Sequence, residues 1–340
     1  MKKIGWVIFA AVLASCGSCN QSTKTDVAIE KPATPDYSSL PKFNEDSCYN
    51  YVAHQCSFGP RVPNTLAAKK CGDYLIKFFK QYADTVYVQN TTVTTFDNHQ
   101  LHIRNVIAAF KPKLGNRLLI ASHWDSRPFA DQEKDVSKMK QPILAADDGA
   151  SGVAVMMELA TLLKNNPPSR GIDLVLLDAE DWGCPSPDSP LSNGKYDEDS
   201  YCLGTQYWCK HPHVKGYTAD NGILLDMVGA RGATFALEAQ SMKYAGDFMN
   251  KVWKTAAGLG YADHFVFQNS GGITDDHVYI NTLLHVPTID IIYHDLYSQT
   301  NWFAPHWHTL NDNMSIMDKT TLKAVGQTLL AVIYQNKTNG

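Results

Sequence analysis

Three apolar runs in the middle of the chain are each followed directly by acidic or histidine residues, and this pairing constrains the fold most strongly. The runs cover residues 118–121, 174–177 and 223–225. Stretches with helical periodicity separate them, which predicts buried parallel strands in an α/β sheet. Ligands of such sheets gather beyond the carboxyl ends of the strands. Carboxylates and imidazoles collected there are costly to bury unless they share a cation, so the pattern indicates a metal-dependent enzyme.

The acidic and histidine side chains come from five short strings. These are His123-Trp124-Asp125, Ala146-Asp147-Asp148-Gly149, Asp178-Ala179-Glu180-Asp181, Leu225-Asp226-Met227 and Trp307-His308-Thr309. A catalytic zinc takes three protein ligands of the His and carboxylate type and keeps one open position. We predict Asp148, Asp181 and His308 as those ligands. Each has an ordinary alternative when taken singly, namely a helix cap, a loop carboxylate and a buried imidazole, but their recurrence at the ends of successive elements favours a metal site.

Periodicity predicts one three-layer α/β/α domain with a mixed, largely parallel central sheet of about six strands. An edge hairpin is expected from residues 86–96 and 102–110. Further strands are expected at 117–121, 172–177, 223–228 and 288–293. Helices are expected at 48–58, 66–82, 149–164, 201–211, 243–259 and 319–334. Residues 183–200 are rich in Pro, Ser, Asn and Asp and predict a long functional loop beside the site.

The first residues predict export. Lys2 and Lys3 precede an apolar stretch at 4–12, which is too short to span a bilayer and is typical of a secretory signal. The stretch ends in Leu-Ala-Ser-Cys, which resembles a bacterial lipobox. We therefore expect a lipoprotein-type signal peptide over 1–16 with a lipid on Cys16, the alternative being a plain signal peptide.

Residues 17–42 are rich in Thr, Ser, Pro and charge, which predicts a flexible tether before a catalytic domain over 43–340. The expected location is a bacterial membrane facing the periplasm or the cell surface, with membrane contact through the lipid on Cys16 alone. The net charge of −4 and the absence of basic runs argue against a nucleic-acid partner.

Eight cysteines in an exported chain suggest disulfides. Seven remain when Cys16 is set aside, so at least one is free or paired elsewhere. The connectivity cannot be read from the sequence, and the spacings match no structural zinc site. The candidates for pairing are Cys48, Cys56, Cys71, Cys184, Cys202 and Cys209.

Taken as a set, the motifs resemble those of the M28 zinc-peptidase superfamily. They are His-x-Asp at 123–125, Ala-Asp-Asp-Gly-Ala-Ser-Gly at 146–152, the pair at 180–181, Leu-Asp-Met-Val-Gly at 225–229 and His-Thr-x-x-Asp at 308–312. Within this superfamily, the chain most resembles the bacterial glutaminyl-peptide cyclotransferases, or glutaminyl cyclases. Three motifs carry this resemblance: His-Trp-Asp-Ser at 123–126, Asp-Asp-His at 275–277 and the run at 307–313. The resemblance spans roughly Phe43 to the C-terminus.

The resemblance implies a role for each matched residue. It places zinc on Asp148, Asp181 and His308, a general acid/base at Glu180, carboxylates near the leaving group at Asp226 and Asp275, and pocket walls at Trp307 and Phe303. Many relatives have Glu where Asp181 stands, which implies a slightly deeper zinc. Mammalian relatives have a further tryptophan in the pocket. Trp182 and Trp208 are the two candidates for the matching residue in this chain, and a packing role is favoured for each. Asp290 replaces a histidine of the animal enzymes, which implies a different hydrogen-bond network around Asp275.

The same residues also fit a two-zinc aminopeptidase. In that alternative His123 and Asp226 hold a second metal, Asp148 bridges, and Glu180 activates water. A cyclase needs one zinc and no activated water, because the α-amine of an N-terminal Gln attacks its own side-chain carbonyl and ammonia leaves. A narrow aromatic pocket that excludes water favours cyclisation, and Trp307 beside His308 could supply its wall. We therefore favour a monomeric cyclase of peptides and proteins with N-terminal Gln, with one zinc and His123 hydrogen-bonding rather than ligating.

A catalytically inactive binding module is a third alternative. It would require erosion of the metal and base positions, and all of them are present.

Overall fold

The computed structural model describes residues 37–192, 194, 196–296 and 303–335. The expected signal peptide, the lipid site at Cys16 and most of the expected tether lie outside these residues. Within the described part, no helix has both the length and the apolar character that a membrane span requires.

Six strands form the central sheet in the order β1-β2-β4-β3-β5-β8. Their bounds are Thr85–Thr94 (β1), Gln100–Phe110 (β2), Arg117–His123 (β3), Gly171–Leu177 (β4), Asn221–Asp226 (β5) and Thr288–Ile292 (β8). The β1–β2 hairpin is antiparallel and lies at one edge, β2 pairs antiparallel with β4, and β4, β3, β5 and β8 run parallel. The predicted mixed, largely parallel sheet with an edge hairpin is therefore confirmed.

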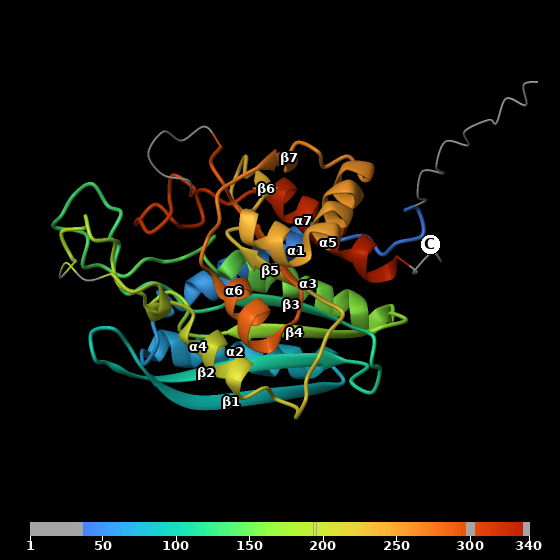
Figure 1. The fold of residues 1–340 in the computed structure, drawn as a ribbon, viewed down its shortest axis with the longest axis horizontal. Coiled ribbons are helices and arrows are strands. Elements are labelled where there is room, and N and C mark those ends of the chain that lie inside the picture. Colours follow the sequence, from blue (N-terminus) through green and yellow to red (C-terminus); the bar gives the residue numbers. More distant parts are fainter. Residues whose placement is uncertain (1–36, 193, 195, 297–302, 336–340) are drawn as a thin grey trace, which may run out of the picture. The chain divides into compact units, whose positions relative to one another are not determined.

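Helices cover both faces of this sheet (Figure 1). The larger set comprises α1 (Glu45–Ser57), α2 (Leu66–Tyr82), α3 (Ala150–Asn165), α5 (Ala239–Gly258) and α7 (Lys319–Tyr334). The opposite face carries α4 (Leu203–Lys210), α6 (Asp276–Tyr279) and a following π-helical turn, Ile280–Leu284. Successive residues of one strand enter different cores. In β3, Ile120 packs in the larger core and Leu119 in the smaller one. Burial on both faces explains why these strands are apolar runs rather than alternating patterns.

Three short elements differ from the sequence prediction. Strands β6 (Phe235–Leu237) and β7 (Phe265–Asn269) form a separate two-stranded sheet, and α6 has only four residues. Segments of this length are too short for a period to be measured. Helix α5 begins at Ala239, before the predicted residue 243, because the Glu238 side chain accepts hydrogen bonds from the backbone N–H groups of Gln240 and Ser241 and caps the helix.

The expectation of disulfides is wrong for the described cysteines. All six candidates are free and buried: Cys48, Cys56, Cys71, Cys184, Cys202 and Cys209. Buried thiols behave as small apolar side chains, and three of these pack in the large core with α1 and α2 while Cys209 packs in the core on the opposite face. Burial accordingly raises the pKa of Cys56 to about 11, which keeps that thiol protonated.

Candidate active site

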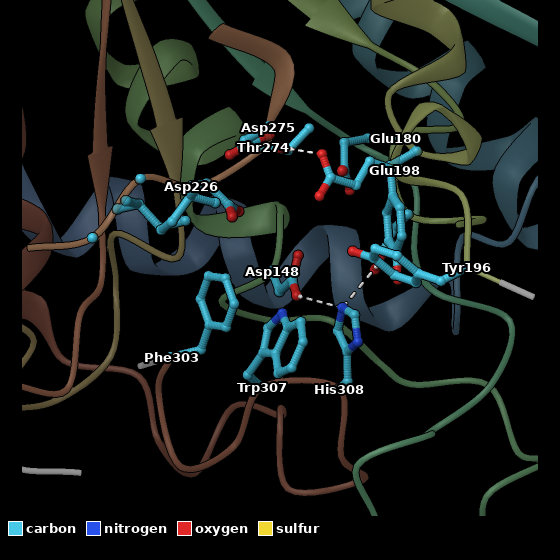
Figure 2. Close-up of a pocket in the computed structure, with 16 residues that line it drawn as sticks. Asp148, Glu180, Tyr196, Glu198, Asp226, Thr274, Asp275, Phe303, Trp307 and His308 are labelled. Carbon is cyan, nitrogen blue, oxygen red and sulfur yellow. Dashed lines mark hydrogen bonds and ion pairs between the residues drawn. The ribbon is translucent and has the colours of Figure 1, made fainter. Parts of the chain in front are cut away.

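The candidate site lies beyond the carboxyl ends of the parallel strands. His123 is the last residue of β3 and Asp226 the last residue of β5, while Glu180 and Asp181 follow β4. Because these strands are parallel and in register, their ends meet at one edge. Asp148 reaches the same edge from the turn before α3. The loop between β8 and α7 brings Trp307 and His308 (Figure 2).

The three predicted zinc ligands come together. The Nε2 atom of His308 lies 3.1 Å from Asp181 Oδ1 and 3.9 Å from Asp148 Oδ2. One ligand atom of each residue lies within 4.8 Å of the other two, and all three side chains are buried. Within the described part of the chain, Asp181 Oδ2 is buried without a hydrogen-bond partner. The site thus offers one imidazole nitrogen and two carboxylates, and one of these, Asp181, has an unpartnered buried oxygen. This set of ligands suits a zinc ion that keeps one open coordination position.

An arginine and an aspartate absent from the predicted set hold two of these ligands in place. Arg127 is fully buried and donates to the Asp181 carbonyl oxygen at 2.8 Å and to both carboxylate oxygens of Asp131. Asp131 Oδ1 in turn lies 3.2 Å from Nδ1 of His308. Burial by itself would raise the pKa of Asp131, but the charges of Arg127 and His308 outweigh this effect and lower that pKa. An ionised Asp131 fixes the proton on Nδ1 and leaves Nε2 of His308 facing the ligand cluster.

Two further carboxylates, Asp125 of the string 123–125 and Asp312 of the motif 308–312, hold backbone N–H groups of the ligand-bearing turns. Asp125 accepts the N–H groups of Glu180 at 3.1 Å and Asp181 at 3.2 Å. Asp312 does the same for the other ligand string, because it accepts the N–H groups of Asp147 at 2.8 Å and Asp148 at 3.1 Å. The acidic strings therefore contain ligands and also the residues that hold the ligand-bearing turns.

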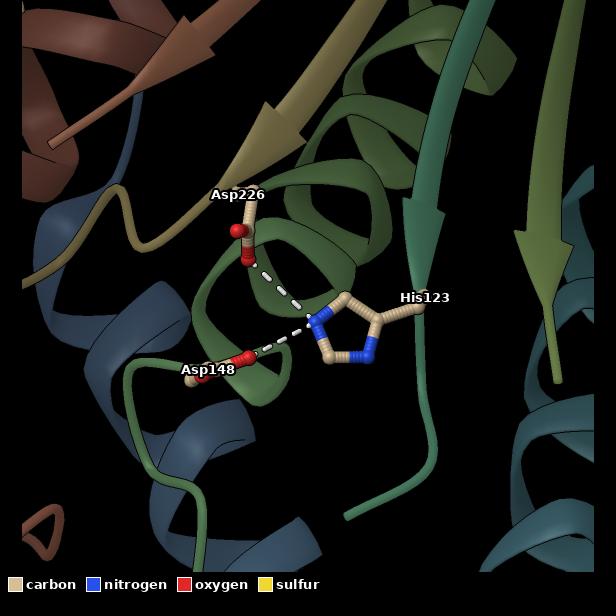
Figure 3. A group of neighbouring side chains, drawn as sticks. All are labelled: His123, Asp148 and Asp226. Atoms are coloured by element: carbon tan, nitrogen blue, oxygen red, sulfur yellow. Dashed lines mark hydrogen bonds and ion pairs between the residues drawn. The ribbon is translucent and has the colours of Figure 1, made fainter. Parts of the chain in front are cut away.

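His123, Asp148 and Asp226 form a second possible metal cluster (Figure 3). Nε2 of His123 lies 2.9 Å from Asp148 Oδ1 and 3.2 Å from Asp226 Oδ1. Although burial opposes it, hydrogen bonds to Asp125, Asp148 and Asp226 raise the pKa of His123 well above its usual value. Asp148 belongs to both clusters, which is the arrangement of a carboxylate that could bridge two metals. The geometry of the ligands therefore accommodates either the one-zinc or the two-zinc alternative.

Glu180 and Asp275 lie close together on one side of the pocket beside these clusters. One carboxylate oxygen of each residue and the Cys202 sulfur lie within 4.8 Å of one another. The Cys202 thiol donates a hydrogen bond to Glu180 Oε1 at 3.4 Å. Burial raises the pKa of Glu180 well above its usual value, and the charges of Asp181 and Asp275 add to it while His123 opposes it. Burial also raises the pKa of Asp275. Carboxylic acids with raised pKa values in a cleft are typical of general acid–base sites.

A cavity of about 420 Å³ opens onto this arrangement. Figure 2 shows Glu180, Asp226 and Asp275 on the side opposite the aromatic residues Phe303 and Trp307. The ring of Trp307 stacks on His308 with centroids 3.8 Å apart, and Phe303 stacks on Trp307 at 4.4 Å. The two residues expected to wall the pocket thus line it. As predicted, the loop 183–200 lies beside the site, where its Tyr196 and Glu198 line the cavity. The loop 271–274, which the sequence did not indicate, also lines it.

Neither tryptophan proposed as a further pocket residue lines the cavity. Trp208 is fully buried in the smaller core, where it packs against Tyr217. Trp182 packs near Ala179, and its ring centroid lies 5.5 Å from that of His99. Both have the packing role that the sequence favoured.

Comparison with known proteins agrees with the fold. The sequence profile of peptidase family M28 matches residues 105–333. The chain belongs to peptidase family M28.

Solved structures of M28-like fold resemble this chain over most of its length. A Zn-dependent exopeptidase from Parabacteroides distasonis is 48% identical with a TM-score of 0.85, and the match covers 88% of this chain and 100% of that one. A glutaminyl cyclase from Bacteroides thetaiotaomicron is 45% identical with a TM-score of 0.84, and the coverage is again 88% and 100%.

Among curated proteins, the glutaminyl-peptide cyclotransferase of Bos taurus is 23% identical over 306 residues, which cover 81% of this chain and 77% of the relative. The chain spans about half the length of the first curated relatives it matches, 46% of one and 54% of the other. The predicted resemblance to the M28 superfamily and to glutaminyl cyclases is confirmed.

Proposed function

We propose that the chain is a glutaminyl-peptide cyclotransferase, which converts the N-terminal glutamine of peptides and proteins to pyroglutamate and releases ammonia. The observation that carries this proposal is the aromatic wall of Phe303 and Trp307 stacked directly on His308, one of the three ligand-type residues. A pocket of this kind holds a small side chain against the ligand cluster and excludes water. The solved glutaminyl cyclase at 45% identity, matched over its whole length, supports it.

Asp148, Asp181 and His308 would hold zinc in this site, and the solved Zn-dependent exopeptidase at 48% identity supports this choice of metal. When bound there, zinc supplies Lewis acidity toward the side-chain carbonyl oxygen of the glutamine. The protein residues do the remaining work by holding the α-amine and the carbonyl carbon of one residue together, so that an intramolecular attack replaces an encounter with water.

Glu180 is the proposed proton carrier. It accepts a proton from the attacking α-amine and returns it to the amide nitrogen, which leaves as ammonia. Its raised pKa makes Glu180 a stronger base than an ordinary carboxylate, which suits acceptance of the amine proton. Asp226 and Asp275 line the same side of the cavity, where their oxygens can accept hydrogen bonds from the substrate nitrogens.

A second candidate function has its own observation. The cluster of His123, Asp148 and Asp226 would hold another zinc if the chain were an M28 aminopeptidase that removes N-terminal residues. In that case Glu180 would activate a metal-bound water instead of moving the proton of an amine.

One experiment separates the two candidates. The purified protein is incubated in parallel with peptides that begin with Gln and with aminoacyl reporters, and its zinc content is counted. We expect pyroglutamate and ammonia, a single zinc per chain, and loss of both metal and activity in His308→Ala. His54→Ala, which removes a histidine on α1 outside the pocket, serves as the control. Release of N-terminal residues that requires two zincs would establish the aminopeptidase instead.

A further inference from the structure

A buried chain of ionisable side chains runs behind the pocket wall, and the proposed reaction does not use it. His277 Nε2 lies 3.2 Å from Glu238 Oε2, and its Nδ1 lies 3.6 Å from Asp290 Oδ2. All three side chains are completely buried. Ligand atoms of Asp275, His277 and Asp290 lie within 4.8 Å of one another. The chain therefore leads from Glu238 through His277 and Asp290 to Asp275, which lines the cavity.

His277 faces a carboxylate with each ring nitrogen. Although burial opposes it, the hydrogen bond and charge of His277 lower the pKa of Glu238 to about 2, which keeps Glu238 ionised. Burial and the neighbouring Asp275 raise the pKa of Asp290 well above its usual value. His277 thus stands between an ionised acid and a pair of acids that can share a proton.

Glu238 is fixed by more than His277. Its carboxylate accepts the N–H groups of Gln240 at 2.8 Å and Ser241 at 2.6 Å at the start of α5. It also accepts the N–H of Ile273 at 2.9 Å, and Ile273 lines the cavity two residues before Asp275. One carboxylate therefore holds a helix end, the pocket loop and the imidazole in a single arrangement. These three backbone hydrogen bonds and the contact with His277 fix the position of the Glu238 carboxylate.

We propose that Glu238 and His277 are positioning residues for Asp275. The His277 ring, anchored by Glu238, orients Asp290, and Asp290 orients the Asp275 carboxyl group and supplies or withholds the proton that they share. Asp275 is thereby held ready to accept a hydrogen bond from the substrate nitrogen. This inference rests on the proposed cyclase function, since it assigns a purpose to the orientation of Asp275.

A double-mutant cycle tests the inference. The variants are His277→Gln, Asp275→Asn and the combination of the two, assayed for pyroglutamate formation with zinc content and melting temperature measured in parallel. We expect His277→Gln to lower kcat on the order of tenfold to a hundredfold, as outer-shell partners often do, with zinc content and KM almost unchanged. In the Asp275→Asn background the same substitution should cost almost nothing further, because the residue that it positions is already disabled.

A matched control is His213→Gln. His213 is half-buried among Trp208, Tyr217 and Tyr87, and it lies outside the cavity. Its substitution removes an imidazole that lies outside the network, and its effect should simply multiply with that of Asp275→Asn. Independent, multiplicative losses for His277→Gln and Asp275→Asn would overturn the inference.

The remaining outcomes are also decisive. If His277→Gln does not fold, Glu238→Gln enters the same cycle, because the amide keeps an acceptor for the α5 cap but loses the charge. If neither variant folds, the pair is structural and the inference is wrong. Wild-type protein that makes no pyroglutamate refutes the proposed function, whereas wild-type turnover without coupling refutes this inference alone.

Discussion

At the scale of single residues, Glu180 takes its expected chemistry from its surroundings. Its backbone N–H donates a hydrogen bond to Asp125. Burial raises the pKa of its side chain most, and the neighbouring acids raise it further. We predict that Glu180→Gln keeps zinc and fold but loses roughly 10²–10⁴-fold in turnover, since an amide cannot carry a proton between two nitrogens. Steady-state kinetics on a Gln-peptide and a zinc assay measure this. Near-normal formation of pyroglutamate would show that Glu180 is not the proton carrier.

Asp226 provides the companion measurement, because its role differs between the two candidate functions. It lies 3.2 Å from His123 and lines the cavity. In a one-zinc cyclase, Asp226→Asn should slow turnover while the zinc content stays unchanged. Loss of a zinc from this variant would instead identify Asp226 as a ligand of a second metal.

At the scale of elements, the close approach of α3 to the sheet determines where Asp148 stands. A Cβ atom on Gly152 would lie 2.6 Å from the carbonyl oxygen of Leu225 and in contact with the Ser122 hydroxyl. We predict that Gly152→Ala lowers the free energy of unfolding by about 1–3 kcal/mol and weakens zinc retention, because α3 and the turn that bears Asp148 must shift. Urea unfolding and zinc titration measure the two effects.

Gly246→Ala in α5 is the matched control. Its added Cβ would meet only the Met242 side chain, at 3.5 Å. The same change in a helix with room should leave stability unchanged or raise it by up to about 1 kcal/mol. Equal effects of the two substitutions would argue against packing as the cause.

At the scale of the whole molecule, a buried acid links stability to pH. Glu158 on α3 is 4% exposed, and burial raises its pKa from 4.5 to about 7 despite hydrogen bonds from Asn44 and Thr161. Its pKa is higher in the folded state, so its stabilising contribution is complete below about pH 4.5 and is lost as the pH rises through about 7.

Glu158→Gln should therefore stabilise the protein at pH 8 by about 1–3 kcal/mol, because the amide never ionises. At pH 5 the same substitution should change the free energy of unfolding little. Urea unfolding at both pH values measures the difference, with Asp188→Asn as an exposed acidic control on the loop 183–200. A stabilisation of equal size at pH 5 and pH 8 would contradict titration of Glu158 as the cause.

The sequence by itself determined the layered sheet and the residues that carry the chemistry. Strands β3, β4 and β5 are buried on both faces, and that burial is written into each segment as an apolar run whose position can be read without its neighbours. Most of the ligand-type residues follow because their strings stand directly after a strand or before a helix, whereas His308 lies within the long loop between β8 and α7. Motif resemblance added the roles expected for Glu180 and Asp275.

Only the tertiary structure decided which charged groups meet. His123 and Asp226 are 103 residues apart in sequence, and Asp147 and Asp312 are 165 apart, yet each pair is in hydrogen-bond contact. No local hydrophobic pattern encodes such contacts, because they depend on how separate helices, strands and loops pack together in space. The same reason hid the anchoring of His308 by Asp131, the contact of Glu238 with His277 and the free state of the described cysteines. Composition suggested disulfides, but packing buried all six as free thiols. Four of them lie in apolar cores, whereas Cys184 contacts the backbone of Asp197 and Cys202 contacts Glu180.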